Sequence, residues 1–529
     1  MVASVNPLAT EAGVQVLKSG GNAIDAAVAV GLTLGVVDGA NSGIGGGCLM
    51  LVRLADGRMV AIDGRETAPA AATRDMFVRD GKADPALSQT GALASGVPGE
   101  IAAFEYAIKN FGRKKFGELF APGAKIAAEG FVLKEGYAAR LKESAEDMAK
   151  FEDERRIFFK DGQPLKAGEV LKQPDLAKTY RALAEQGAEW FYHGPFARAA
   201  ETWMKSHGGI MTAADFAAYR AKLREPVSTD YRGYQVVTFP PPSSGGVHLL
   251  EMLNTLEHFD LKSLDEARRL HLIAEAMKLA FADRAHWLGD PDFARVPRGL
   301  ISKEYAAALA KKIDPNHAMA SPQHGTPQGA ETDVFSQKHT THFSVADTEG
   351  NWVACTCTVN TSFGSKVVVP GTGVFLNNEM DDFSAQPGVP NYFGLIGAEA
   401  NAVAPGKRPL SSMTPTIVLK NGQPVIALGA AGGPKIITAV LLELVAMLDL
   451  DKTPVEALAA PRVHHQWFPD ELYVESPLDP KVKDGLRALG QKVVETKPGA
   501  VSQIVARSAD GKSFVGAADP RAGGNAEGF

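Results

Sequence analysis

Two adjacent threonines, Thr340 and Thr341, lie between His339 and His342 at a predicted loop-to-strand junction. A threonine hydroxyl is a weak nucleophile and needs a base within hydrogen-bond reach, usually a histidine. On a strand, however, His342 points to the side of Thr340 and away from Thr341. No carboxylate that could orient either histidine is close in sequence, so the pattern gives little support to a Ser/His-type triad.

A second base exists if the chain is cut before Thr340. The freed α-amino group, with an ordinary pKa of about 7.7 to 8.0, is then close enough to the hydroxyl to accept its proton near neutral pH. The exposed segment 315–339 suits such a cut, because it is rich in Pro, Gly, Gln and His and has no helical or strand period. The alternative is that both threonines only favour strand formation.

Gly432 and Gly433 lie between a predicted strand, PVIALG, and a predicted helix over 435–448. Backbone N–H groups at such a helix N-terminus can face a developing oxyanion, although an ordinary strand-to-helix turn is the alternative. Proline precedes Lys435, so the loop lacks the GK[ST] ending of a phosphate-binding loop and ATP use is not indicated.

The chain contains three cysteines, and two of them, Cys355 and Cys357, are two residues apart on a predicted strand. This spacing suits neither a mutual disulfide nor a zinc knuckle. His464 and His465 are adjacent on an extended segment, so they point to opposite faces and are expected to pack rather than to bind a metal. We expect no metal site, and the cysteines do not indicate a compartment.

The elements that must position these residues begin with two predicted helices over 9–37, the first capped by Thr10. The glycine cluster GIGGG at 43–47 follows a helix and precedes two strands, which is the reverse of a dinucleotide-binding loop. We interpret it as a tight connection. Apolar residues at helical spacing then dominate from about residue 100 to 310.

The pattern changes from Thr340 onward, where short strands are joined by turns such as Asn421-Gly422. We therefore predict an α+β fold with two parts. Residues 1–339 are helix-rich and end in the flexible linker 315–339, and residues 340–529 are strand-rich.

Composition excludes several classes of protein. The 529 residues include 55 Lys and Arg and 61 Asp and Glu, a net charge of −6, with no dense basic run, so nucleic acid is not an expected partner. The most apolar stretches are shorter than the ~20 residues of a membrane span. No signal peptide is visible at the start, so a cytoplasmic location is not excluded.

Several longer motifs occur together: TTHFSVADTEGNWVACTCTVNTSFG, FLNNEMDDFSAQPGVPNYFGL, RPLSSMTPT, GAAGGPKIIT and APRVHHQW. In this order they resemble the gamma-glutamyltranspeptidases (glutathione hydrolases), which are self-processing N-terminal-nucleophile hydrolases, and the resemblance extends over nearly the whole chain. It implies a four-layer αββα sandwich without metal or organic cofactor. It also implies cleavage between His339 and Thr340, giving a heterodimer of chains 1–339 and 340–529.

The resemblance assigns roles to the chemistry-bearing residues. Thr340 would be the nucleophile for self-cleavage and for catalysis, supported by a hydrogen bond from Thr358, and Gly432 and Gly433 would face the oxyanion. The substrates would be γ-glutamyl amides such as glutathione, and the acceptors water, amino acids or dipeptides.

The γ-glutamyl head carries one carboxylate and one ammonium group. By resemblance, the carboxylate is bound by Arg65, Ser411 and Ser412, and the ammonium by Asn360, Glu379 and Asp382. Taken singly, these residues have ordinary interpretations as surface ion pairs, turn residues or caps.

Two departures from the well-known bacterial members stand out. Phe393 occupies the lid position where many relatives have a tyrosine, with Tyr392 beside it, so lid closure is expected to be weaker. The family implies a periplasmic or secreted protein, although no signal peptide is encoded here.

Two alternatives remain open: a cephalosporin (glutaryl) acylase of the same superfamily, and an unprocessed, inactive relative that only binds γ-glutamyl peptides.

Overall fold

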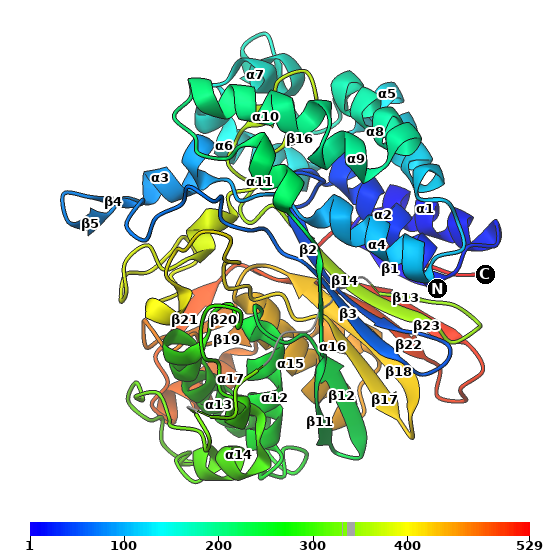
Figure 1. Cartoon of the computed structure of the whole chain (residues 1–529). Coiled ribbons are helices and arrows are strands. Elements are labelled where there is room, and N and C mark those ends of the chain that lie inside the picture. Colours follow the sequence, from blue (N-terminus) through cyan, green and yellow to red (C-terminus); the bar gives the residue numbers. More distant parts are fainter. Residues whose placement is uncertain (331, 336–343) are drawn as a thin grey trace.

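Two antiparallel sheets lie face to face between two layers of helices in the computed structural model, which describes residues 1–330, 332–335 and 344–529 (Figure 1). The first sheet consists, in spatial order, of β10 (Lys222–Arg224), β3 (Met59–Gly64), β2 (Gly47–Arg53), β14 (Trp352–Thr358), β13 (Val345–Ala346), β1 (Val2–Ser4) and β24 (Asn525–Glu527). The second consists of β11 (Val227–Tyr231), β12 (Tyr234–Thr238), β17 (Thr416–Lys420), β18 (Gln423–Ala431), β22 (Val501–Arg507) and β23 (Phe514–Ala518). The predicted α+β class and the four-layer αββα sandwich are confirmed.

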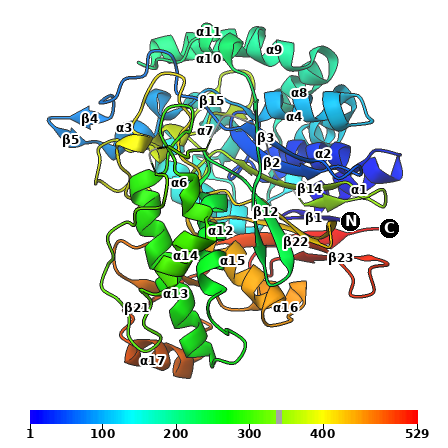
Figure 2. The same ribbon diagram turned by 60° about the horizontal axis from the view of Figure 1, so that its bottom comes forward.

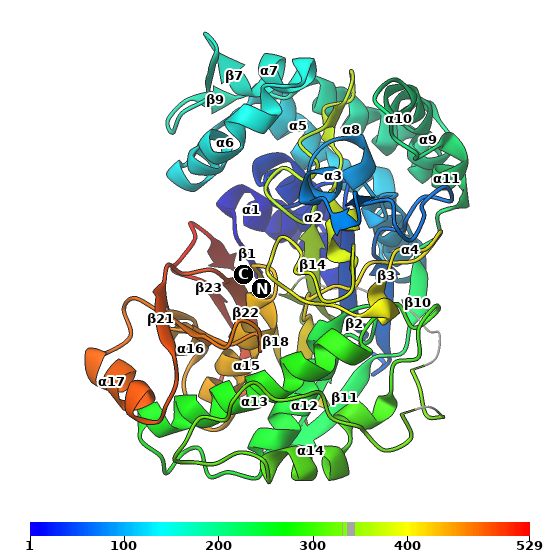
Figure 3. The same ribbon diagram turned by 90° about the vertical axis from the view of Figure 1, so that its left-hand side faces the viewer.

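Helices cover the outer face of each sheet (Figures 1 and 3). The first sheet is covered by α1 (Pro7–Lys18), α2 (Ala23–Val37), α4 (Glu100–Phe111), α5 (Ala121–Glu129) and α8 (Pro174–Gln186). The second is covered by α12 (Ser244–Leu256), α13 (Glu266–Trp287), α15 (Lys435–Leu448) and α16 (Pro454–Ala459), with α14 (Lys303–Ala310) and α17 (Pro480–Ala488) packed outside them (Figure 2). Every residue of α2 is buried, which explains why it is apolar all round rather than on one stripe.

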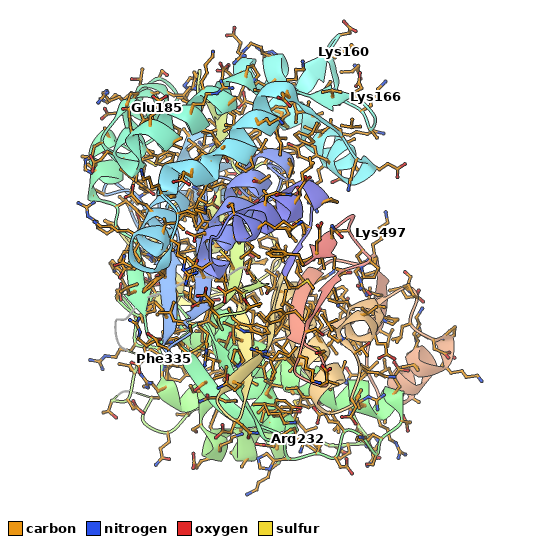
Figure 4. All side chains as sticks on the ribbon, turned by 90° about the vertical axis from the view of Figure 1, so that its right-hand side faces the viewer. Lys160, Lys166, Glu185, Arg232, Phe335 and Lys497 are labelled. Carbon is orange, nitrogen blue, oxygen red and sulfur yellow. The ribbon has the colours of Figure 1, made fainter. Side chains whose placement is uncertain are left out.

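A smaller helical lobe extends beyond the first sheet and contains α6 (Glu135–Met148), α7 (Glu152–Phe158), α9 (Ala188–Tyr192), α10 (Pro195–Ser206) and α11 (Ala213–Ala218). Long charged side chains such as Lys160 and Lys166 project from this lobe (Figure 4). The two chain ends lie together on the first sheet, because β1 pairs with β24.

Both sheets combine strands from before and after residue 340. In the first sheet β2 pairs with β14 along seven residues, and in the second β12 pairs with β17 along four. The two predicted parts of the chain therefore share their sheets and their cores rather than folding side by side.

The first helix begins earlier than predicted. Asn6 caps α1 by accepting a hydrogen bond from the N–H of Leu8, and Pro7 occupies the first helical position. Thr10 lies inside the helix and contacts Ser4 through its hydroxyl, so the prediction that Thr10 is the cap was wrong.

The glycine cluster after α2 forms the tight connection predicted from the sequence. A Cβ on Gly46 would lie 2.0 Å from the backbone oxygen of Thr358, and the carbonyl of Gly46 accepts the N–H of Gly99 at 2.9 Å. Only glycine allows this approach, and the approach fixes the end of β14.

Residues 315–330 contain no helix or strand, as predicted, but they are held against α13. The N–H of Met319 donates to Glu275, and the N–H of Gly325 donates to Asp283. His339, Thr340, Thr341 and His342 lie outside the described residues. Within the described ranges, no helix is long and apolar enough to cross a membrane.

Candidate functional site

A single cavity of about 1100 Å³ gathers nearly all the residues predicted to carry chemistry. They come from the ends of β3, β14 and β18 and from the loops between β16 (Val374–Phe375) and β17. The members that line it are Arg65, Thr358, Asn360, Glu379, Asp382, Ser411, Ser412, Gly432 and Gly433. Thr340, the predicted nucleophile, lies outside the described residues.

Arg65 is fully buried just beyond β3 and forms ion pairs with two carboxylates. Its Nη1 lies 2.5 Å from Glu379 Oε2, its Nη2 lies 2.5 Å from Asp382 Oδ2, and its Nε donates to the carbonyl of Pro409. Burial acts to lower the pKa of Arg65, yet the carboxylates of Glu379 and Asp382 raise it above its ordinary value. The guanidinium therefore stays charged at every working pH.

The acids around Arg65 outnumber it. Burial raises the pKa of Glu379 to about 8, although Arg65 acts in the opposite direction. Glu66 is also fully buried, with its Oε2 3.7 Å from Arg65, and burial raises its pKa well above the usual range. Burial therefore favours the protonated forms of Glu379 and Glu66 near neutral pH.

Thr358 is the last residue of β14, and its hydroxyl is fixed by a residue two positions after it. Its Oγ1 accepts the N–H of Asn360 at 2.7 Å, and this requires Asn360 to adopt φ +76°. Asn360 tolerates the left-handed region because its side chain donates to the carbonyl of Asn378. Sequence reasoning missed Asn378, which holds the loop that orients the site.

Gly432 and Gly433 have φ values of +140° and +60° at the start of α15. A Cβ on Gly433 would lie 2.7 Å from the ring of Phe393, and one on Gly432 would lie 2.4 Å from the carbonyl of Gly499. Within the described part of the chain, neither N–H donates a hydrogen bond. Two backbone donors beside a helix N-terminus can therefore stabilise a negative oxygen.

Comparison with known proteins identifies the family. The sequence profile described as "Gamma-glutamyltranspeptidase" matches residues 9–529. This chain belongs to the gamma-glutamyltranspeptidase family. It is 47% identical to the glutathione hydrolase proenzyme of Escherichia coli over 526 residues, covering 98% of this chain and 90% of that protein.

Solved structures of the family and its relatives share the fold. The gamma-glutamyltranspeptidase of Helicobacter pylori is 43% identical, with a TM-score of 0.60 over 62% of this chain and 95% of that chain. A cephalosporin acylase from Bacillus halodurans is 30% identical, with a TM-score of 0.89 over 100% of this chain and 95% of that chain.

Ser411 and Ser412, the serines predicted to bind the substrate carboxylate, have different hydrogen-bond partners in this transpeptidase-family site. Ser411 is buried, and its Oγ accepts the N–H of Met413. Ser412 Oγ lies 3.5 Å from Arg284 Nη2, while Arg284 Nε donates to Ser244. Burial lowers the pKa of Arg284 to about 10, against the pull of Asp382.

Arg284 was missed by sequence reasoning because it belongs to the regular helical pattern of α13. The only sequence signal was the turn PPPSSGG, which contains its partner Ser244. A second buried guanidinium therefore stands beside the serines predicted to bind a carboxylate.

The predicted lid segment lies over the glycine pair. The ring of Phe393 packs on Gly433 and meets the ring of Tyr392 edge-on at 5.2 Å. The amide of Gln466 donates to the carbonyl of Phe393, and the N–H of Tyr392 donates to Asp381. The Tyr392 side chain is exposed and lines the cavity, so this lid segment carries its tyrosine hydroxyl one residue before Phe393.

Proposed function

We propose that the chain is a self-processing enzyme that cleaves the γ-glutamyl amide bond of glutathione and related compounds. The main supporting observation is the cavity that places a permanent cation, Arg65, against Glu379 and Asp382. An α-amino acid head carries one charge of each sign, so this arrangement can bind both of its charged groups. Charge-assisted hydrogen bonds of this kind contribute about 1.5 to 3 kcal/mol each.

In the proposed reaction, Thr340 Oγ attacks the γ-carbonyl carbon while the free α-amino group of Thr340 accepts its proton. The carbonyl oxygen becomes an oxyanion facing the N–H groups of Gly432 and Gly433. The C–N bond then breaks, and the leaving amine takes the proton. Water, or the amino group of an amino acid or dipeptide, attacks the ester and releases Thr340.

Self-cleavage between His339 and Thr340 is part of the same proposal, with chains 1–339 and 340–529 remaining together. The sheets support this, because each one contains strands from both sides of the cut. Separating the chains would expose both cores and break the pairing of β2 with β14.

A glutaryl acylase is the second candidate, favoured by the likeness to the cephalosporin acylase structure. A glutaryl group has no ammonium, so it would leave Glu379 and Asp382 without a ligand partner. We therefore expect γ-glutamyl-p-nitroanilide to be cleaved at least about 100-fold better than glutaryl-p-nitroanilide. In Asp382→Asn this ratio should fall at least tenfold, because truncating one side of a buried charge pair costs about 2 to 5 kcal/mol. A ratio near one in the wild type would favour the acylase.

Self-processing is tested on a denaturing gel, with N-terminal sequencing of the smaller fragment. The wild type should give two bands with Thr340 as the new terminus, and Thr340→Ala should give one. Thr341→Ala is the matched control and should still be cut. A wild type that stays in one piece but retains affinity for γ-glutamyl ligands would support the inactive binding relative.

The compartment is proposed from family membership alone, as periplasmic or secreted. Fractionation of cells that express the gene from its natural start would test it. Recovery of the processed enzyme only with cytoplasmic markers would contradict the proposal.

A further inference from the structure

All three cysteines of the chain meet on one face of the first sheet. Cys357 on β14 is the direct partner of Cys48 on β2, and Cys355 is on the same face of β14 two residues earlier. The sulfur atoms of Cys355 and Cys357 are 4.0 Å apart, and all three sulfurs lie within 4.8 Å of one another. The described residues contain no other such group of potential metal ligands.

A buried carboxyl group lies beside this cluster, outside the group of atoms within 4.8 Å of one another. Glu100 is the first residue of α4, is fully buried, and has no hydrogen-bond partner for either carboxylate oxygen among the described residues that meets normal geometry. The side chains of Cys48 and Cys357 lie close enough to influence its ionisation. Burial raises the pKa of Glu100 well above its ordinary range, so the acid holds its proton when no cation is nearby.

We propose that Cys48, Cys355, Cys357 and Glu100 bind one Zn²⁺ ion. Four-coordinate zinc with Zn–S bonds of about 2.3 Å requires sulfurs about 3.8 Å apart, close to the separation of Cys355 and Cys357. Thiolates suit zinc and copper(I), and a carboxylate as fourth ligand favours zinc over the softer copper(I). A site with four protein ligands is of the closed, structural type.

The protons of the ligands must leave when zinc binds. Binding therefore releases the protons that the thiols and the Glu100 carboxyl hold, so the apparent zinc affinity should rise with pH.

The simpler interpretation is that the cysteines pack as small apolar residues, which buried cysteines often do. That interpretation accounts for Cys48 and Cys355, which belong to the core beneath α2 and α4. It leaves the buried carboxyl of Glu100 with only a weak thiol neighbour, Cys357, and burying such a group is costly.

The site also has an entry route and a structural consequence. Cys357 is only partly buried and belongs to the lining of the main cavity, next to Thr358. Beyond the Cys357 and Cys48 pair, the next pair along the two strands is Thr358 with Gly47. A bound ion would therefore tie β2 to β14 at the end of the strand that carries Thr358.

The test is a metal titration of the reduced, chelator-treated full chain with Zn²⁺ against a chromophoric chelator. We expect one equivalent bound with submicromolar affinity, a higher thermal midpoint, and a sulfur-to-cadmium charge-transfer band with Cd²⁺.

Cys355→Ser should lose at least about 100-fold in affinity for zinc. Glu100→Gln should lose at least about tenfold with its three thiols intact. Glu105→Gln is the matched control on the same helix and should bind zinc like the wild type, because among the described residues Glu105 accepts only the N–H of Ala188.

The wild-type titration stands even if a variant fails to fold. The proposal is overturned if denatured wild type shows three free thiols but the folded protein binds no more zinc than Cys355→Ser. It is also overturned if the isolated protein contains a Cys48 to Cys357 disulfide and takes up no zinc after reduction. Both readouts are independent of catalytic activity.

Discussion

Glu379 and Glu100 are two fully buried acids that differ in whether the chain supplies them with a cation. Glu379 lies in the cavity with the Arg65 guanidinium 2.5 Å away. Glu100 lies on the other side of β14, against cysteines, with no cationic partner among the described residues. With Arg65 beside Glu379, the cavity suits a ligand that carries one positive and one negative group. Glu100 has thiols beside it and no cation, so it is suited to bind a metal ion from solution.

The two acids are separated by the alternation of one strand. Side chains of β14 point in turn to opposite faces, so the hydroxyl of Thr358 and the thiol of Cys357 point to opposite sides of the sheet, although both residues contribute to the lining of the main cavity. The cysteine face packs under α2 and α4, while Trp352 and Ala354 on the other face belong to the core shared with the second sheet.

Replacing the resident cation should have the largest effect. Arg65→Lys keeps the charge but cannot contact Glu379, Asp382 and the carbonyl of Pro409 together. Breaking buried pairs of this kind costs about 3 to 5 kcal/mol, so kcat/KM for γ-glutamyl-p-nitroanilide should fall at least about 100-fold. Arg58→Lys, in an exposed ion pair with Asp56, is the control and should change kcat/KM less than about twofold. Equal effects in both variants would contradict the role of Arg65.

Removing the hydroxyl at the end of β14 should have the next largest effect. Thr358→Val keeps the shape but leaves the N–H of Asn360 without its acceptor and removes the proposed support for Thr340. We expect kcat/KM to fall by about 30-fold, equivalent to about 2 kcal/mol. Thr356→Val is the control on the same face of the strand, because the Thr356 hydroxyl makes no hydrogen bond to the described residues, and it should change kcat/KM less than about threefold. A normal rate in Thr358→Val would remove Thr358 from the mechanism.

The contrast between the two sides of β14 also shows what the sequence could predict. The α+β class and the hairpins after Thr340 were accessible because they depend on local periodicity and turn residues. The residues that line the cavity were named only because contiguous motifs resemble a known family. The cysteine cluster was not accessible, because Cys48 joins Cys355 and Cys357 only through the pairing of β2 with β14, which no local spacing encodes. Arg284 was missed for a similar reason. The sequence of α13 has a regular helical pattern, and only the folded structure brings Arg284 beside Ser412.

Ligand binding should depend on pH through Glu379. Its pKa of about 8 means that the free site holds a proton there below that pH, and an ammonium ligand must displace it. Inhibition by L-glutamate should therefore tighten about fivefold between pH 7 and pH 8 while the ligand keeps its ammonium. Glu379→Gln should bind L-glutamate more weakly, and its affinity should not change between pH 7 and pH 8.

The same shift has a consequence for stability. The folded-state pKa of Glu379 lies above the ordinary value of 4.5, so the folded chain binds an extra proton between those pH values. The contribution of this group to stability is therefore fully present below about pH 4.5 and is lost as the pH rises toward 8. If inhibition by L-glutamate still tightens between pH 7 and pH 8 in Glu379→Gln, another group is responsible for that pH dependence.

The smallest effect is expected at the acid without a cation. In chelator-treated protein at pH 6, Glu100→Gln replaces one neutral group by another and should shift the thermal midpoint by no more than about 2 °C. Because the pKa of Glu100 is raised, its contribution to wild-type stability declines as the pH rises, so the variant should gain relative to the wild type at pH 9. Zinc should reverse that order, since only the wild type has the carboxylate ligand. If the variant is strongly destabilised at every pH without zinc, Glu100 has a permanent partner within the chain, and the contrast with Glu379 does not hold.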